Sequence, residues 1–178
     1  MGNRPQVIWI TGLSGAGKST LAQAVAARLR DDGESVVLLD GDELREVFDA
    51  AAVCAQNHGR EGRLALAMRY AHLCRVIADQ GVRVVIATIS LFHEVHAWNR
   101  QNLPGYFEVY LRVPVDELRS RDPKGIYRRY DAGELQNVAG LDLEIDEPTA
   151  ADLVLDAERG HTVEASTDIL ISTINGSN

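Results

Sequence analysis

The sequence predicts an α/β fold in which five parallel strands form a doubly wound sheet with helices on both faces. One observation is a series of apolar, largely β-branched runs at residues 7–10, 36–39, 84–89, 107–113 and 153–155. Such runs are typical of strands buried on both faces. A second is the three- and four-residue spacing of apolar side chains between them, and a third is the glycine-rich connection after the first run. Strands that alternate with helices favour parallel βαβ units over hairpins.

Composition limits the class of protein. The chain has 178 residues, with 46% hydrophobic residues, and we expect residues 1–178 to form one domain. The net charge of −8 argues against general binding to nucleic acid or to membrane surfaces. No signal peptide or membrane-spanning stretch is visible, so we expect a cytoplasmic protein whose Cys54 and Cys74 are reduced thiols.

The first strand leads into Gly-Leu-Ser-Gly-Ala-Gly-Lys-Ser at residues 12–19, which fits the phosphate-binding loop of P-loop proteins. A helix with apolar residues four apart follows at 19–30 and completes the strand–loop–helix context of this motif. Glycines bring bare N–H groups close to phosphate, and the helix N-terminus adds partial positive charge. Lys18 should bridge the β- and γ-phosphates of ATP, and the Ser19 hydroxyl should bind Mg²⁺. The predicted ATP-binding residues here are Gly12, Ser14, Gly15, Ala16, Gly17, Lys18, Ser19 and Thr20.

The second strand ends in Asp40-Gly41-Asp42, and a helix begins at residue 43. Ligands collect at the carboxyl ends of strands in open α/β sheets. Beside a phosphate loop, Asp40 and Asp42 are therefore candidates for organising Mg²⁺ through water and for acting as a base. The alternative for Asp42 is a helix cap.

Residues 50–62 show no clean periodicity and are predicted to be a loop over the substrate side, followed by a helix at 64–80. The third strand ends at Ser90, and a short helix is expected at 97–102. His93 and His96 suggest a zinc site, but they are three residues apart, whereas the zinc motif needs histidines four apart on one helix face. We therefore predict no metal ligation by this pair.

The fourth strand is followed by a helix at 115–121 and by the most basic stretch of an acidic chain, at residues 122–130. This stretch predicts either a solvated basic face or a mobile lid, over about 121–140, that closes on the phosphates of ATP. A last helix is expected at 167–174. Together these features indicate the P-loop nucleotide-kinase arrangement with a basic lid.

The ordered motifs resemble the adenylylsulfate kinase family along nearly the whole chain. The matching pieces are GLSGAGKST at 12–20, DGDELR at 40–45, ATIS at 87–90, RDPKGIY at 121–127 and Gly-Leu-Asp at 140–142. The resemblance implies transfer of the ATP γ-phosphate to the ribose 3′-hydroxyl of a 5′-substituted nucleotide, and a homodimer. It implies Lys18, Asp42 and Asp40 as catalytic residues and Arg121 and Lys124 as lid residues near ATP. Ser90 matches a serine often marked as a phosphorylated intermediate, although direct transfer needs no covalent step.

Two departures bear on the acceptor. Two phenylalanines usually sandwich adenine in this family, and His58 and Val138 stand at those positions. Residues 86–94 and 98–100 resemble instead a subgroup found with capsule genes, which includes cytidine diphosphoramidate kinase. The substrate-binding residues implied by the resemblance are Asp42, Arg45, His58, Arg63, Arg69, Ile89, Ser90, Leu91, Lys124 and Val138.

The sequence therefore favours a kinase for a small cytidylyl nucleotide. Adenylylsulfate as the acceptor is the main alternative, and a P-loop nucleotide-binding module without turnover is a more distant one. A hydrolase is disfavoured, because a closing lid excludes water.

Overall fold

A computed structural model describes residues 5–48, 59–156, 160 and 162–176. Five strands form one sheet in the order β2-β3-β1-β4-β5, and every neighbouring pair is parallel. The predicted α/β class and parallel sheet are confirmed. The strands are β1 (Val7–Gly12), β2 (Val36–Asp40), β3 (Arg83–Thr88), β4 (Tyr106–Arg112) and β5 (Leu153–Asp156).

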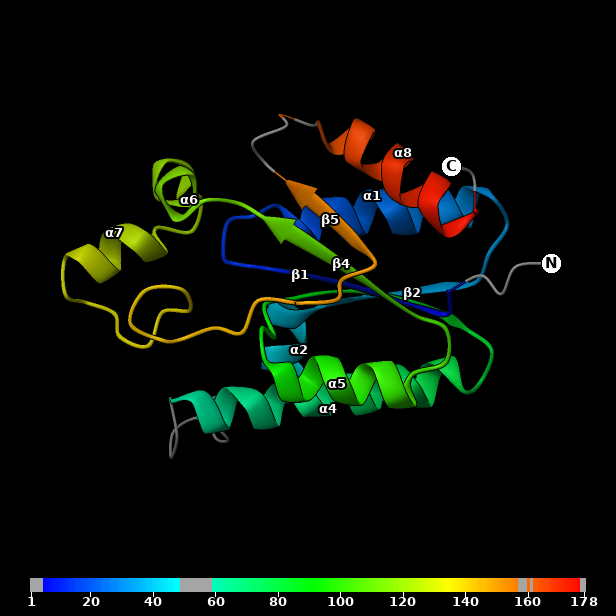
Figure 1. Ribbon diagram of the computed structural model, residues 1–178, viewed down its shortest axis with the longest axis horizontal. Helices are drawn as coiled ribbons and strands as arrows, with labels where there is room; N and C mark the ends of the chain where they lie inside the picture. Colours follow the sequence, from blue (N-terminus) through cyan, green and yellow to red (C-terminus); the bar gives the residue numbers. More distant parts are fainter. Residues whose placement is uncertain (1–4, 49–58, 157–159, 161, 177–178) are drawn as a thin grey trace.

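Helices cover both faces of the sheet, and two further helices lie beyond the carboxyl ends of the strands. Figure 1 shows α1 and α8 on one face, α2, α4 and α5 on the other, and α6 and α7 beyond the arrowheads of β4 and β5. The helices are α1 (Lys18–Asp31), α2 (Gly41–Val47), α4 (Arg60–Ala78), α5 (His93–Asn102), α6 (Val115–Arg121), α7 (Ile126–Asp131) and α8 (Val163–Ile174). No helix within the described residues combines the length and the apolar character needed to span a membrane.

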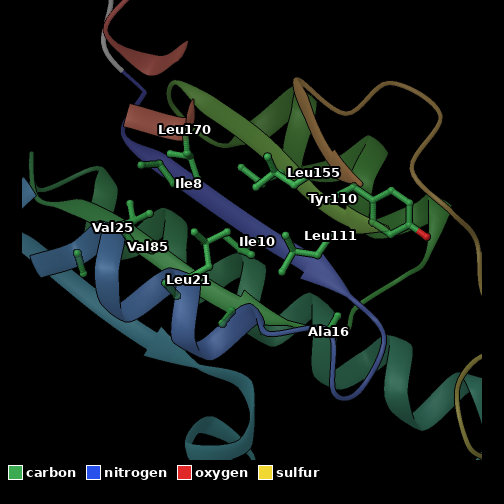
Figure 2. Close-up of a cluster of buried hydrophobic side chains, with 14 of the residues drawn as sticks. Ile8, Ile10, Ala16, Leu21, Val25, Val85, Tyr110, Leu111, Leu155 and Leu170 are labelled. Atoms are coloured by element: carbon green, nitrogen blue, oxygen red, sulfur yellow. The ribbon is translucent and has the colours of Figure 1, made fainter. Parts of the chain in front are cut away.

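The central strand β1 explains why the core has two halves. Successive side chains of a strand point to opposite faces, so Ile8 and Ile10 pack with α1 and α8, whereas Val7 and Trp9 pack with α4 and α5. Figure 2 shows the first half, where Leu21, Val25 and Leu170 surround these isoleucines. All six residues of β1 are buried, as expected for the middle strand of a covered parallel sheet.

Three predicted helices begin four residues earlier than the apolar periodicity indicated, and α2 begins at Gly41 rather than residue 43. Helix α4 starts at Arg60 rather than residue 64, so residues 60–62 are helical and the predicted loop is wrong there; residues 50–58 lie outside the described residues. Helix α5 starts at His93 rather than residue 97, and α8 starts at Val163 rather than 167. The first turns of α4 and α5 are rich in charged and histidine side chains, and that of α8 has an exposed Val163 and Glu164. Capping and ion pairs hold these turns: Thr162 accepts from the amide of Ala165 (3.2 Å), and Arg60 pairs with Glu94 (2.9 Å).

Candidate functional site

A cavity of about 830 Å³ opens at the carboxyl edge of the sheet. The phosphate loop, the ends of β2 and β3, and the first turns of α2 and α4 form its floor and one side. The connection between α6 and α7 and a segment at residues 135–145, which we call the strap, form the other side. The topology predicts a ligand site at this edge, where the strand order reverses.

The phosphate loop owes its shape to glycines with positive φ. Gly15 and Gly17 have φ values of 81° and 93°, which side chains rarely allow. At Gly12 an added Cβ would lie 2.8 Å from the backbone oxygen of Leu111 on β4. Tyr127 of α7 donates its hydroxyl hydrogen to the backbone oxygen of Ser14 (3.0 Å), so the start of the basic segment is fastened to the loop.

Lys18 lies largely buried in this loop. Its Nζ donates to the backbone oxygen of Leu13 (2.7 Å). Burial, and then the positive charge of Lys124, lower the pKa of Lys18 to about 8, although Asp42 and Asp40 oppose the shift. Within the described part of the chain, this ammonium group has one carbonyl acceptor, which leaves it well suited to an incoming polyanion.

Two carboxylates from the end of β2 face the loop in different ways. The Ser19 hydroxyl donates to Asp40, whose second oxygen accepts from the amide of Asp42 (2.8 Å) and so caps α2. The capping role considered for Asp42 is therefore wrong, because Asp40 is the cap. Ser19 and Asp40 place a hydroxyl and a carboxylate side by side, and oxygen ligands of this kind suit Mg²⁺.

Asp42 forms an ion pair across the cavity with Lys124, which lies between α6 and α7. Burial raises the pKa of the Asp42 carboxyl, but the hydrogen bond to Lys124 and the charges of Lys124, Arg45 and Lys18 together hold it below its usual value. Asp42 is therefore ionised at neutral pH, and its carboxylate can accept hydrogen bonds.

The end of β3 brings Ile89, Ser90 and Leu91, which were predicted to bind substrate, to the cavity wall. Ser90 has a φ of 31°, which is uncommon for a residue with a side chain. Its Oγ lies 2.8 Å from Oγ1 of Thr88, and Thr11 of β1 donates to the backbone oxygen of Ile89.

The strap is held by an arginine and an aspartate. Arg63 of α4 lines the cavity and donates to the backbone oxygen of Asn137 (2.6 Å). The carboxylate of Asp142 accepts from the amides of Asn137 (2.8 Å) and Val138 (2.6 Å). These contacts fix Val138, an aliphatic side chain, in the cavity wall. Arg45 also lines the cavity.

Other predicted residues lie elsewhere. Arg69 is exposed on α4 and does not line the cavity, and Arg121 pairs with Glu117 along α6, also outside the lining. Gly12 and Ala16 shape the phosphate loop from behind the cavity wall. His58 lies outside the described residues.

The two histidines considered for zinc have other contacts. His96 lies 3.1 Å from the backbone oxygen of Ser90, and His93 lies 3.9 Å from Asp146. No group of three or more histidine, cysteine or acidic side chains among the described residues could hold a metal ion.

Sequence reasoning missed several residues of the lining. Ile126 and Arg129 come from the basic segment, and Tyr70 and Phe92 come from α4 and the turn before α5. Tyr70 donates to the backbone oxygen of Gly41 (3.1 Å), and the Arg60 guanidinium lies 5.3 Å from the centre of the Phe92 ring. In the sequence, the apolar residues Ile126 and Phe92 have the pattern of ordinary core residues. Their place in the cavity wall depends on the fold.

Comparison with known proteins bears on the chemistry of this cavity. The family model described as adenylylsulphate kinase matches residues 4–156. The chain is 37% identical over 174 residues to the cytidine diphosphoramidate kinase of Campylobacter jejuni, covering 98% of this chain and 99% of that protein. It is 38% identical over 157 residues to the adenylyl-sulfate kinase of Paraburkholderia xenovorans, covering 88% and 86%.

Among solved structures, the fold is similar to that of the Mycobacterium tuberculosis APS kinase in complex with AMPPNP and APS. The TM-score is 0.86 at 30% identity, with coverage of 97% of this chain and 98% of that one.

Proposed function

The chain belongs to the adenylylsulphate kinase family of ATP-dependent kinases that phosphorylate a hydroxyl group, and from that premise we propose that its acceptor is a cytidine nucleotide. The reaction proposed is transfer of the γ-phosphate of ATP to the ribose 3′-hydroxyl of a 5′-substituted cytidine diphosphate, with cytidine diphosphoramidate the best candidate.

The aliphatic wall at Val138 is the observation that carries this proposal. The resemblance places a phenylalanine at this position in enzymes that sandwich adenine, and stacking on an aromatic ring contributes about 1–3 kcal/mol per base. The Val138 side chain, which is 8% exposed, gives a purine no ring face at this position of the wall. The aromatic lining residues Tyr70 and Phe92 come from α4 and the turn before α5 instead. The similarity to the Campylobacter jejuni enzyme over nearly the full length of both chains supports the same acceptor.

On the ATP side, the amides of the phosphate loop and Lys18 would bind the phosphates. Lys18 would leave the backbone oxygen of Leu13 and turn to the β- and γ-phosphates, where its charge offsets charge on the transferred group. Ser19 and Asp40 fit a Mg²⁺ ion that also binds phosphate oxygens, since Mg²⁺ in such sites takes few protein ligands. The ion would neutralise phosphate charge during transfer.

On the acceptor side, the oxygen of the ribose hydroxyl would attack the γ-phosphorus while ADP leaves. Asp42 would accept the proton of that hydroxyl. Its ion pair with Lys124 would then open, which frees Lys124 for phosphate and Asp42 for the hydroxyl. Arg45 lies on the same wall and supplies positive charge for the 5′ substituent.

The deciding experiment compares kcat/KM for cytidine diphosphoramidate and for adenylylsulfate at saturating ATP, because discrimination between substrates is expressed in that ratio. We expect the cytidylyl compound to be preferred. Val138→Phe should shift the ratio toward adenylylsulfate by a factor that corresponds to about 1–3 kcal/mol. Val154→Phe, on the exposed side of β5, is the matched control and should leave the ratio unchanged.

Efficient turnover of adenylylsulfate with none of the cytidylyl compound would show that the acceptor proposal is wrong. The Mycobacterium tuberculosis APS kinase, whose structure is a complex with AMPPNP and APS, makes adenylylsulfate the second candidate.

A further inference from the structure

The turn after β3 is held in place by a side chain that lies outside the cavity. Ser90 has a left-handed backbone, so the turn needs contacts that keep it there. Its backbone oxygen accepts two hydrogen bonds, from the amide of Phe92 (3.0 Å) and from Nε2 of His96 on α5 (3.1 Å). The first bond is within the turn, whereas the second ties the turn to a separate helix.

The hydrogen-bond pattern defines the tautomer of His96. A carbonyl oxygen only accepts, so Nε2 must carry the hydrogen and Nδ1 is bare in the neutral ring. Nδ1 is buried and has no partner within the described part of the chain. Nε2 also lies 3.7 Å from Oε1 of Glu108, which favours a hydrogen on that nitrogen. Burial lowers the pKa of His96, and Glu108 and the Ser90 carbonyl oppose the shift, with the net value below the usual one.

We propose that His96 is a positioning residue for the acceptor nucleotide, acting through the Ser90 carbonyl. Its Nε2–H fixes the turn that carries Ser90, Leu91 and Phe92, all of which line the cavity. His96 itself is not part of that lining. The inference depends on the proposed function only for the assignment of this wall to the acceptor rather than to ATP.

Removal of the hydrogen bond from His96 to the Ser90 carbonyl should therefore weaken binding of the acceptor and not of ATP. In His96→Leu, the turn loses its tie to α5, and the KM for the acceptor should rise about five- to tenfold, the effect of one neutral hydrogen bond. The KM for ATP should stay within about twofold, because the phosphate loop has no contact with His96 and is held by Tyr127 and the Leu13–Lys18 bond instead.

A conservative variant separates positioning from packing. The amide nitrogen of glutamine can reach a position close to that of histidine Nε2, so His96→Gln should restore the acceptor KM. His93→Leu is the matched control, because the His93 side chain is 59% exposed and makes no contact with the Ser90 carbonyl. Hydrogen exchange of the peptide that covers residues 90–93 should be faster in His96→Leu than in wild type and normal in His96→Gln.

The assays use both cytidine diphosphoramidate and adenylylsulfate, with the full chain. A selective rise in the KM for the acceptor that is turned over, with rescue by glutamine, supports the role of His96 whichever acceptor wild type prefers. Unchanged acceptor KM and unchanged exchange in His96→Leu would overturn it. An equal rise in both KM values, unrelieved by glutamine, would also overturn it and assign His96 to packing alone. Preference of wild type for adenylylsulfate would overturn only the cytidylyl proposal.

Discussion

At the scale of single residues, the site brings together opposite charges, of which Asp42 and Lys124 are exposed to solvent. Lys18, Lys124, Asp40 and Asp42 lie around one cavity of an otherwise acidic chain. Asp42 and Lys124 form an ion pair without ligand, and among the described residues Lys18 has only the Leu13 carbonyl as hydrogen-bond acceptor. ATP binding must therefore rearrange these partners.

Lys18 should take up a proton when ATP binds at alkaline pH. Its pKa of about 8 lies below the ordinary value of 10.5, so in the free protein it is mostly neutral at about pH 9 and mostly charged at about pH 7. Phosphate favours the charged form and raises the pKa again. Calorimetry in two buffers of different ionisation enthalpy should detect uptake of up to one proton at about pH 9 and little at about pH 7. Proton uptake should vanish in Lys18→Met. This variant should remain folded but lose phosphoryl transfer. Normal turnover in it would contradict the catalytic role of Lys18.

Asp42→Asn should lower kcat by about 10²–10⁴-fold, the usual contribution of a general base, while ATP affinity changes little. Glu43→Gln is the matched control, since the neighbouring Glu43 is exposed and does not line the cavity. Steady-state kinetics and equilibrium binding of ATP separate the two effects. A fall in ATP affinity with unchanged kcat would move the role of base to another residue.

Ser90→Ala should retain measurable turnover, because direct in-line transfer needs no phosphorylated serine. The Ser90 hydroxyl lies 2.8 Å from Oγ1 of Thr88. This hydrogen bond gives the Ser90 hydroxyl a structural role that requires no covalent step. Mass spectrometry of wild type after incubation with ATP alone should detect no phosphoserine at this position. A stoichiometric phosphoserine that passes its phosphate to the acceptor would reverse this conclusion.

At the scale of elements, the strap and the phosphate loop are fitted against each other. Gly140 has a φ of 82°, and an added Cβ would lie 2.9 Å and 3.0 Å from the two methyl carbons of Leu13. Leu13 also supplies the carbonyl that holds Lys18. A change in the strap can therefore reach the ATP site through one side chain.

Gly140→Ala should reduce both stability and ATP affinity. Gly133→Ala is the control, because Gly133 has a φ of 75° and nothing within 4 Å of an added Cβ. Both variants should lose about 1–2 kcal/mol of unfolding free energy from backbone strain, as measured by urea denaturation. Only Gly140→Ala should also displace Leu13 and weaken ATP binding; equal ATP affinity in the two variants would rule out the coupling.

At the scale of the whole molecule, the cavity joins segments from the phosphate loop to the strap, so ligand binding should stabilise the fold. MgATP at about 100 times its Kd should add about 2.7 kcal/mol and raise Tm by about 5–10 °C. Removal of divalent ions with EDTA should abolish most of this shift, since Mg²⁺ and the phosphates bind together. Differential scanning fluorimetry measures this change in Tm. An equally large change in Tm in the presence of EDTA would argue against a metal role for Ser19 and Asp40.

Local patterns were sufficient to predict the five strands, the phosphate loop and the charged residues at strand ends. The starts of helices were predicted least well, because apolar periodicity begins only where a helix meets the core. Arg60 of α4 and Val163 of α8 are exposed or half-buried first residues that lie before that point. Apolar cavity residues such as Phe92 carry no local signal that separates lining from core.

The sequence by itself determined the alternation of strands and helices and the chemistry available at the carboxyl edge of the sheet. Only the tertiary structure decided which groups meet: Lys124 with Asp42, Arg63 with the carbonyl of Asn137, and His96 with the carbonyl of Ser90. The cap of α2 is a local contact by comparison, because Asp40 accepts from the amide of Asp42 two residues later. The reason is physical: periodicity and turn chemistry depend on neighbours a few residues away. The partner of a long side chain depends on how distant segments pack, and Lys124 and Asp42 are 82 residues apart in the chain.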